Sequence, residues 1–71
     1  MGRPPPITNR VRELRDARAM SQAALGDAIG VTRQTIIAIE QGRYSPSLES
    51  AFRIARQFGV GLEDVFGWDE A

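Results

Sequence analysis

The reactive side chains of this sequence are mainly guanidinium, amide and hydroxyl groups, with few of the groups that enzymes use as nucleophiles or metal ligands. The 71 residues contain no Cys and no His, and Lys is also absent. Thiolate, imidazole and Schiff-base chemistry are therefore unavailable, and no Ser lies near a recognisable base. The acids at 63–64 and 69–70 are typical of a solvated surface. We expect no enzymatic activity, no cofactor and no metal site.

Arginine and amide side chains are instead suited to hydrogen bonding with nucleic acid. Arg33 and Gln34 are adjacent; an arginine can bond to O6 and N7 of guanine, and a glutamine to N6 and N7 of adenine. The net charge is zero, but it is unevenly distributed. Residues 1–43 hold seven arginines and four acids, giving +3, whereas residues 44–71 hold two arginines and five acids, giving −3. This asymmetry predicts a basic binding face and a separate rear face.

Five helices are expected to position these side chains. Capping residues and apolar spacing predict helices from Thr8 or Asn9 to about Ala19, from Ser21 to Ile29, from Thr32 to Gly42, over 48–58 after a cap at Ser47, and over 62–66. Gly30 is expected as a left-handed cap. No segment alternates with period two, so no strand is predicted. The predicted fold class is all-α: an extended arm over 1–7, a compact five-helix domain over 8–66 and a tail over 67–71.

The most specific pattern lies within residues 22–41. Its core positions are Leu25, Ile29, Val31, Ile36 and Ile39. Three residues, 30–32, join the second and third helices, which should therefore cross steeply. Gly26 lies where these helices approach, and a side chain larger than Ala should hold them apart. The pattern predicts a helix-turn-helix that leaves these residues outward on its third helix: Arg33, Gln34, Thr35, Ile37 and Ala38.

The sequence resembles the Cro/repressor-type, or XRE-type, helix-turn-helix family. The matching segments occur in the family's order and spacing over roughly residues 8–66: NRVRELR at 9–15, MSQAAL at 20–25, GVTRQTI at 30–36, IEQGR at 39–43, PSLE at 46–49, IA at 54–55, FGV at 58–60 and LEDVF at 62–66. The resemblance implies a phage-repressor-like fold that binds double-stranded DNA in transcription regulation, with its third helix in the major groove.

The resemblance also implies roles for individual residues. Gln22 matches a residue that contacts phosphate and supports the third helix, and Arg33 and Gln34 match positions that read base edges. Arg15 and Glu40 match a pair that forms an internal salt bridge, so we interpret them as structural. The other residues expected at the DNA are Arg10 and Arg43 on phosphate, Thr32 and Thr35, and Ile37 and Ala38 against thymine methyls. Ile37 has a second interpretation as a core residue, and relatives often carry a polar residue there.

The C-terminal region indicates a protein–protein contact. The fourth helix is expected to bury Phe52, Ile54, Ala55 and Phe58. Trp68 lies beyond the last helix with little core left to cover it. In the family this region commonly forms a two-fold contact, and the expected dimer or partner surface comprises Leu62, Val65, Phe66 and Trp68. A homodimer on a palindromic operator is the leading hypothesis. The alternative is an antitoxin-like or other partner-binding protein of the same fold that also binds its own promoter.

Length and hydropathy limit the cellular setting. The sequence has the size of one domain. It shows neither an apolar run of transmembrane length nor the apolar core of a signal peptide. We therefore expect a cytoplasmic protein without a membrane partner.

Overall fold

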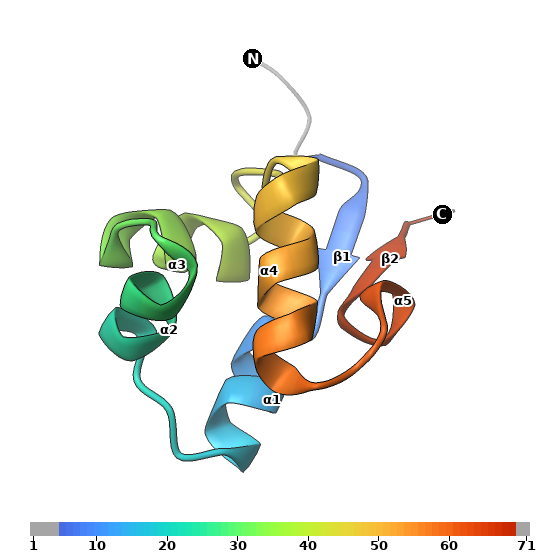
Figure 1. The fold of residues 1–71 in the computed structure, drawn as a ribbon. Helices are drawn as coiled ribbons and strands as arrows, with labels where there is room; N and C mark the ends of the chain where they lie inside the picture. Colours follow the sequence, from blue (N-terminus) through green and yellow to red (C-terminus); the bar gives the residue numbers. More distant parts are fainter. Residues whose placement is uncertain (1–4, 70–71) are drawn as a thin grey trace.

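The computed structural model describes residues 5–69 of the chain. Its elements are β1 (Ile7–Asn9), α1 (Val11–Ala17), α2 (Gln22–Ile29), α3 (Arg33–Glu40), α4 (Leu48–Phe58), α5 (Leu62–Val65) and β2 (Phe66–Trp68). Figure 1 shows α4 between the α2–α3 pair on one side and α5 with the two strands on the other. The predicted all-α fold with five helices is confirmed, and a small sheet is a minor addition to it.

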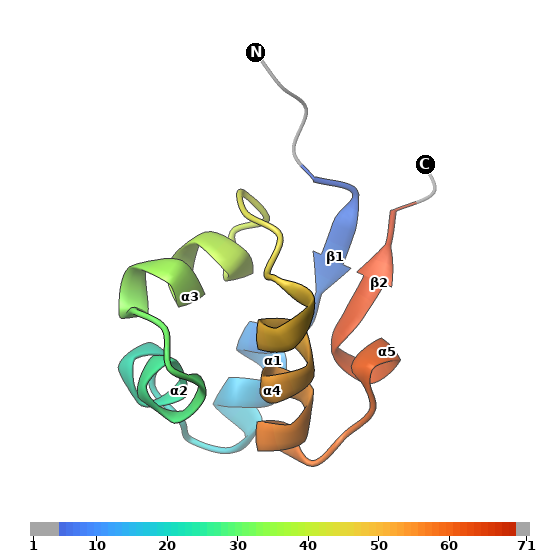
Figure 2. The same ribbon diagram turned by 45° about the horizontal axis from the view of Figure 1, so that its top comes forward.

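The two strands contradict the prediction of a chain without β-structure. They are antiparallel, with Ile7 opposite Trp68, Thr8 opposite Gly67 and Asn9 opposite Phe66, and they run side by side in Figure 2. Ile7, predicted in the extended arm, and residues 67–68, predicted in the C-terminal tail, therefore lie in paired strands. Three-residue strands are too short to show a periodic pattern, and their pairing depends on the helices that bring the ends of the domain together.

Three of the five helices in the described residues begin at a side-chain cap. The hydroxyl groups of Ser21, Thr32 and Ser47 each accept a hydrogen bond from the backbone N–H three residues later. Gly30 ends α2 with φ of 82°, a left-handed conformation that glycine adopts without steric cost. These predictions are confirmed. The first helix differs, because α1 begins at Val11 and ends at Ala17, and the residues predicted to cap it lie in β1. The last helix ends at Val65, one residue earlier than predicted.

One apolar core joins all five helices. Its members are Val11, Leu25, Ile29, Ile36, Ile39, Ile54, Ala55, Phe58 and Val65, with Leu14, Met20, Val31, Val60 and Phe66 packed against it. Phe52 was predicted to be buried on α4, and this was wrong, because 48% of it is exposed and Ala51 is buried on that helix instead. No helix in the described part of the chain is long and apolar enough to span a membrane.

Gly26 sets the distance between α2 and the turn that leads to α3. A Cβ atom built on Gly26 would lie 2.8 Å from the backbone oxygen of Val31 and 3.3 Å from that of Thr32. The contact is tighter than expected from sequence, because even an alanine would press against backbone atoms rather than against a flexible side chain. Glycine at this position therefore allows the closest approach of the two helices that form the candidate site.

Candidate nucleic-acid interface

Helix α3 presents a polar first turn to the outside and buries its inner face. Ile36 and Ile39 are 0% and 1% exposed, whereas Arg33 and Gln34 are exposed at the first turn. Thr35, Ile37 and Ala38 are half-buried. Within the described residues, neither the Arg33 side chain nor the Gln34 side chain forms a hydrogen bond or an ion pair. Their donors and acceptors are therefore available to a ligand.

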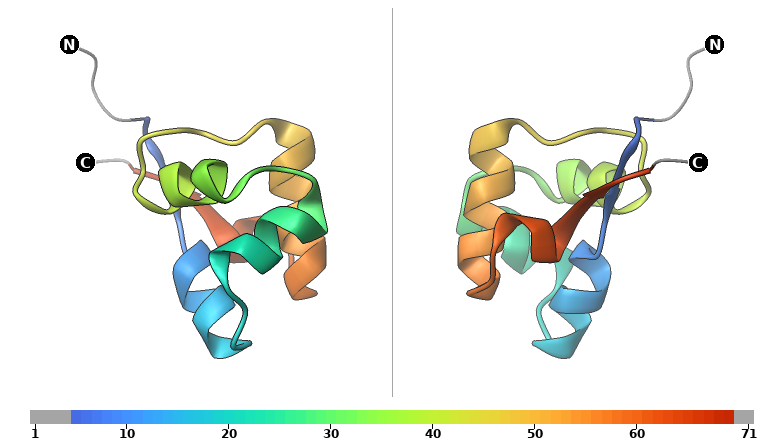
Figure 3. Two further views of the ribbon diagram at one scale, coloured as in Figure 1. Left: turned by 90° about the vertical axis from the view of Figure 1, so that its left-hand side faces the viewer. Right: turned by 90° about the vertical axis from the view of Figure 1, so that its right-hand side faces the viewer.

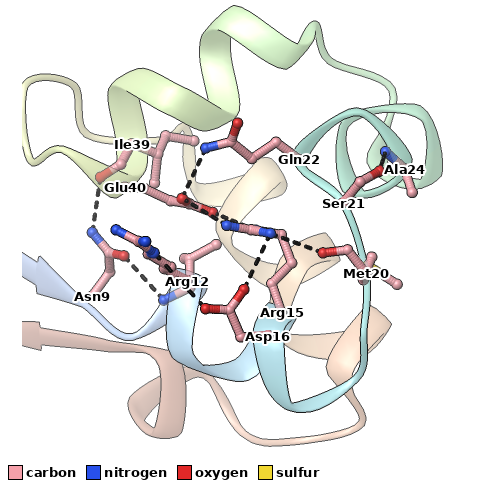
Figure 4. Close-up of polar contacts among 11 residues, drawn as sticks. Asn9, Arg12, Arg15, Asp16, Met20, Ser21, Gln22, Ala24, Ile39 and Glu40 are labelled. Atoms are coloured by element: carbon pink, nitrogen blue, oxygen red, sulfur yellow. Dashed lines mark hydrogen bonds and ion pairs between the residues drawn. The ribbon is translucent and has the colours of Figure 1, made fainter.

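An ion pair fixes the C-terminal end of α3 to α1. The guanidinium of Arg15 donates from Nε to Glu40 Oε2 at 2.8 Å and from Nη2 to Glu40 Oε1 at 3.3 Å. The two side chains are only 11% and 6% exposed. Arg15 also donates to the Met20 carbonyl at 2.9 Å, and the hydrogen bond to Glu40 is the main cause that raises its pKa above the ordinary arginine value. The structural pair that the family resemblance implied is thus present (Figure 4).

Two amide side chains complete the support of α3. Gln22, the first residue of α2, donates from Nε2 to Glu40 Oε1 at 3.1 Å. Asn9 donates from Nδ2 to the Ile39 carbonyl at 2.9 Å and accepts at Oδ1 from the Val11 N–H at 3.0 Å. Figure 4 shows both amides reaching α3 from neighbouring elements. The position of α3 is therefore set by α1, α2 and β1 together. The sequence suggests Asn9 only as a helix cap, because nothing in it indicates contact with a helix 30 residues away.

A groove of about 540 Å³ lies between α1, the start of α2 and the outer side of α3. Gln22 and Ala23 line it from α2, and Arg33 and Ile37 line it from α3. The left view of Figure 3 faces the side of the molecule that carries α2 and α3. The groove brings a base-reading candidate and a phosphate-contact candidate, Arg33 and Gln22, onto one surface.

Apart from Arg10, the other expected contacts with DNA lie around this surface, and some have partners within the chain. Arg43 is exposed just beyond α3 and donates from Nε to Gln41 Oε1 at 2.8 Å. The hydroxyl groups of Thr32 and Thr35 lie 3.0 Å apart at the start of α3. Arg10 lies toward α5, where it donates to the Asp64 carbonyl at 3.3 Å, and it forms an exposed ion pair with Glu13 at 2.9 Å; this ion pair lowers the pKa of the Glu13 carboxyl.

A second surface, opposite α2 and α3, is apolar. A groove of about 260 Å³ there is lined by Ile7, Pro46, Leu48, Ala51, Leu62 and Phe66. Leu48 is 70% exposed and Trp68 is 64% exposed. Because Trp68 pairs with Ile7 and alternates with Phe66 along β2, all three side chains lie on one side of the sheet. We call Leu48, Phe52, Leu62, Phe66 and Trp68 the apolar face; the right view of Figure 3 shows the side with α4, α5 and the strands.

The apolar face differs from the predicted contact surface in two places. Val65 does not contribute to it, since Val65 is 1% exposed and belongs to the core. Leu48 and Phe52 were not predicted, although they are four residues apart and so lie on one side of α4. That spacing is the signal that could have identified them. It is also compatible with core packing, which is the interpretation that the sequence favours for Phe52.

Comparison with known proteins agrees with this geometry. The family model described as helix-turn-helix matches residues 11–65. A helix-turn-helix-type transcriptional regulator of Methanocaldococcus jannaschii is 47% identical over 64 residues, covering 90% of this chain and 97% of the relative. The regulator YgzD of Bacillus subtilis is 50% identical with the same coverage. The cryptic phage CTXphi transcriptional repressor RstR of Vibrio cholerae is 33% identical over 59 residues, covering 83% of this chain and 53% of RstR.

A solved structure has the same fold. The restriction-modification controller protein C.AhdI of Aeromonas hydrophila superimposes with a TM-score of 0.71 at 28% identity, covering 76% of this chain and 78% of that one. Helices α2 and α3 are joined by a three-residue turn, and α3 exposes polar side chains at its first turn. This arrangement defines a helix-turn-helix DNA-binding protein. The chain belongs to the XRE-type helix-turn-helix family of transcriptional regulators, a family of non-enzymatic proteins.

Proposed function

We propose that the protein binds a specific sequence in double-stranded DNA by inserting the first turns of α3 into the major groove. The observation behind this proposal is that the side chains at the start of α3 are exposed and have no partner in the described residues. The rest of α3 is fixed by contacts with α1, α2 and β1. Arg33 and Gln34 are the base readers, because their side chains are available and match the hydrogen-bonding edges of guanine and adenine. The support behind α3 limits the backbone entropy lost when the helix binds.

Phosphate contacts surround the reading helix in this proposal. Gln22 uses the amide hydrogen left over from its bond to Glu40, and Arg43 lies beyond the end of α3. Thr35 contacts a phosphate or a base, while Thr32 keeps its hydroxyl on the helix cap. To bind a phosphate, Arg10 must give up its exposed ion pair with Glu13 and its hydrogen bond to the Asp64 carbonyl. Such contacts fix the position of the protein on the duplex but carry no sequence information.

We further propose that two copies bind one operator as a dimer through the apolar face. Exposed apolar side chains of this size on a small domain are typical of an interaction surface. The apolar face lies on α4, α5 and the sheet, away from the start of α3, so pairing leaves the reading helices free. A two-fold dimer then places its reading helices about 34 Å apart on a palindromic site.

Substitution of Arg33 and of Arg43 tests the proposed reading mode. Arg33→Ala should cost about 1–3 kcal/mol on the preferred sequence and relax the preference at one base position. Arg43→Ala is the matched control, since it removes the same group from a phosphate contact. It should weaken binding to all sequences alike and reduce the salt slope by about one. Fluorescence anisotropy with operator variants and random duplex measures both effects. Equal loss on every sequence for Arg33→Ala would refute its assignment as a base reader.

A further inference from the structure

Ile37 is an aliphatic side chain on the outer side of α3 that has no role in the core. Ile36 and Ile39 belong to the core cluster, whereas Ile37 belongs neither to that cluster nor to the partly buried apolar residues packed against it. It lies in the wall of the groove beside Arg33 and Ala23. The alternative interpretation of Ile37 as a core residue is therefore wrong, and the part of its half-buried side chain that stays exposed needs a different explanation.

The position of Ile37 relative to Arg33 indicates what it meets. The two residues are four apart on α3, so they lie on the same side of the helix, about 6 Å apart along its axis. That distance corresponds to about two base steps. If Arg33 contacts a base edge, Ile37 faces the edge of a nearby base pair in the same groove. The side chain can neither donate nor accept a hydrogen bond there.

The major-groove edges of the bases differ in how favourably they contact an aliphatic side chain. Amino groups of adenine and cytosine and the carbonyl groups of guanine and thymine lose water partners against a hydrocarbon and gain nothing in return. A methyl group on C5 of a pyrimidine is the apolar feature of this groove. Ala38, which offers a single methyl, reaches less far from the helix than the branched Ile37.

We propose that Ile37 selects a base pair through the C5-methyl group, so that thymine and 5-methylcytosine are accepted and unmethylated cytosine is disfavoured. This inference rests on the proposed function and adds a form of regulation to it, since the affinity of an operator with cytosine at this position then depends on methylation of that base. The expected difference is about fourfold per half-site, which corresponds to the burial of one methyl group.

Removing or adding one methyl group in the DNA tests this inference without altering the protein. In the operator selected from random duplex, each thymine is replaced by uracil and each cytosine by 5-methylcytosine, one at a time. Wild-type protein should lose about fourfold at one thymine per half-site when the methyl group is removed. An operator with cytosine at that position should bind about as weakly as the uracil operator. An operator with 5-methylcytosine there should regain the affinity of the thymine operator. Sequence-specific binding with no uracil-sensitive position would overturn the inference.

Substitutions at residue 37 assign the effect to this side chain. Ile37→Ala should bind the uracil and thymine operators alike with an unchanged salt slope, whereas Ile37→Val should retain most of the difference. Thermal unfolding checks that both variants fold. If Ile37→Ala still shows the wild-type difference in affinity between the thymine and uracil operators, the assignment of the effect to Ile37 is overturned. If no operator is selected at all, the proposed function itself fails, which is a distinct result from specific binding that ignores the methyl group.

Discussion

Glu40→Ala should lower the free energy of unfolding by about 3–5 kcal/mol, because it leaves the buried guanidinium of Arg15 with only the exposed carboxylate of Asp16, 3.4 Å away, as an ion-pair partner. Arg15 is 11% exposed and makes two of its hydrogen bonds to Glu40. Gln22 loses its acceptor as well. Since a domain of this size has a total stability of about 4–10 kcal/mol, the variant should be close to unfolding at room temperature. Urea denaturation followed by circular dichroism measures the change.

Two further variants isolate the contribution of burial. Arg53→Ala is the matched control, since its ion pair with Glu49 is as short, at 2.6 Å, but its side chains are 55% and 72% exposed. It should cost about 0.5 kcal/mol or less. The double variant Arg15→Met, Glu40→Leu removes both charges and should recover much of the loss, because apolar side chains can replace a buried pair. A cost below about 1 kcal/mol for Glu40→Ala would contradict the structural role given to this pair.

Leu48→Glu should dissociate the proposed dimer and lower operator affinity by about 100-fold or more, because only one half-site is then held at a time. The substitution puts a charge into the apolar face at a residue that is 70% exposed. The monomer should remain folded, because an acidic residue in the first turn of α4 is favoured by the helix dipole. Sedimentation equilibrium and gel-shift titration of the operator measure the two effects.

Gln57→Glu provides the control for the dimer prediction. It makes a similar acidic substitution at an exposed position on the opposite side of α4, and it should change neither assembly nor affinity. Wild-type protein that stays monomeric at all concentrations would contradict the dimer. Operator binding that then requires a second protein seated on the apolar face would support the antitoxin-like alternative.

Features set by neighbouring residues could be predicted from the sequence. The caps at Ser21, Thr32 and Ser47 and the turn at Gly30 depend on hydrogen bonds and backbone conformations within a few residues. The buried positions Leu25, Ile29, Ile36 and Ile39 follow from helical spacing. The outward position of Arg33 and Gln34 follows from the same spacing, so the candidate reading face could be predicted as well.

Features that depend on distant segments could not be predicted. The β1–β2 pairing joins three-residue strands from opposite ends of the domain, and neither strand has a pattern of its own. Asn9 supports α3 only because that pairing places it beside Ile39. The pairing of Arg15 with Glu40 across 25 residues came from family resemblance rather than from spacing. Phe52 and Val65 were misassigned because an apolar residue on a short helix fits either a core or a contact surface.

The most direct test of the central claim is selection of binding sites from random duplex DNA, with affinity then followed against salt concentration. The proposed function predicts an enriched two-fold symmetric sequence whose half-sites lie about one turn of DNA, ~34 Å, apart, bound with a steep salt dependence. Recovery of no enriched sequence, with only weak salt-sensitive binding, would contradict it. That result would mean that the exposed start of α3 does not read bases.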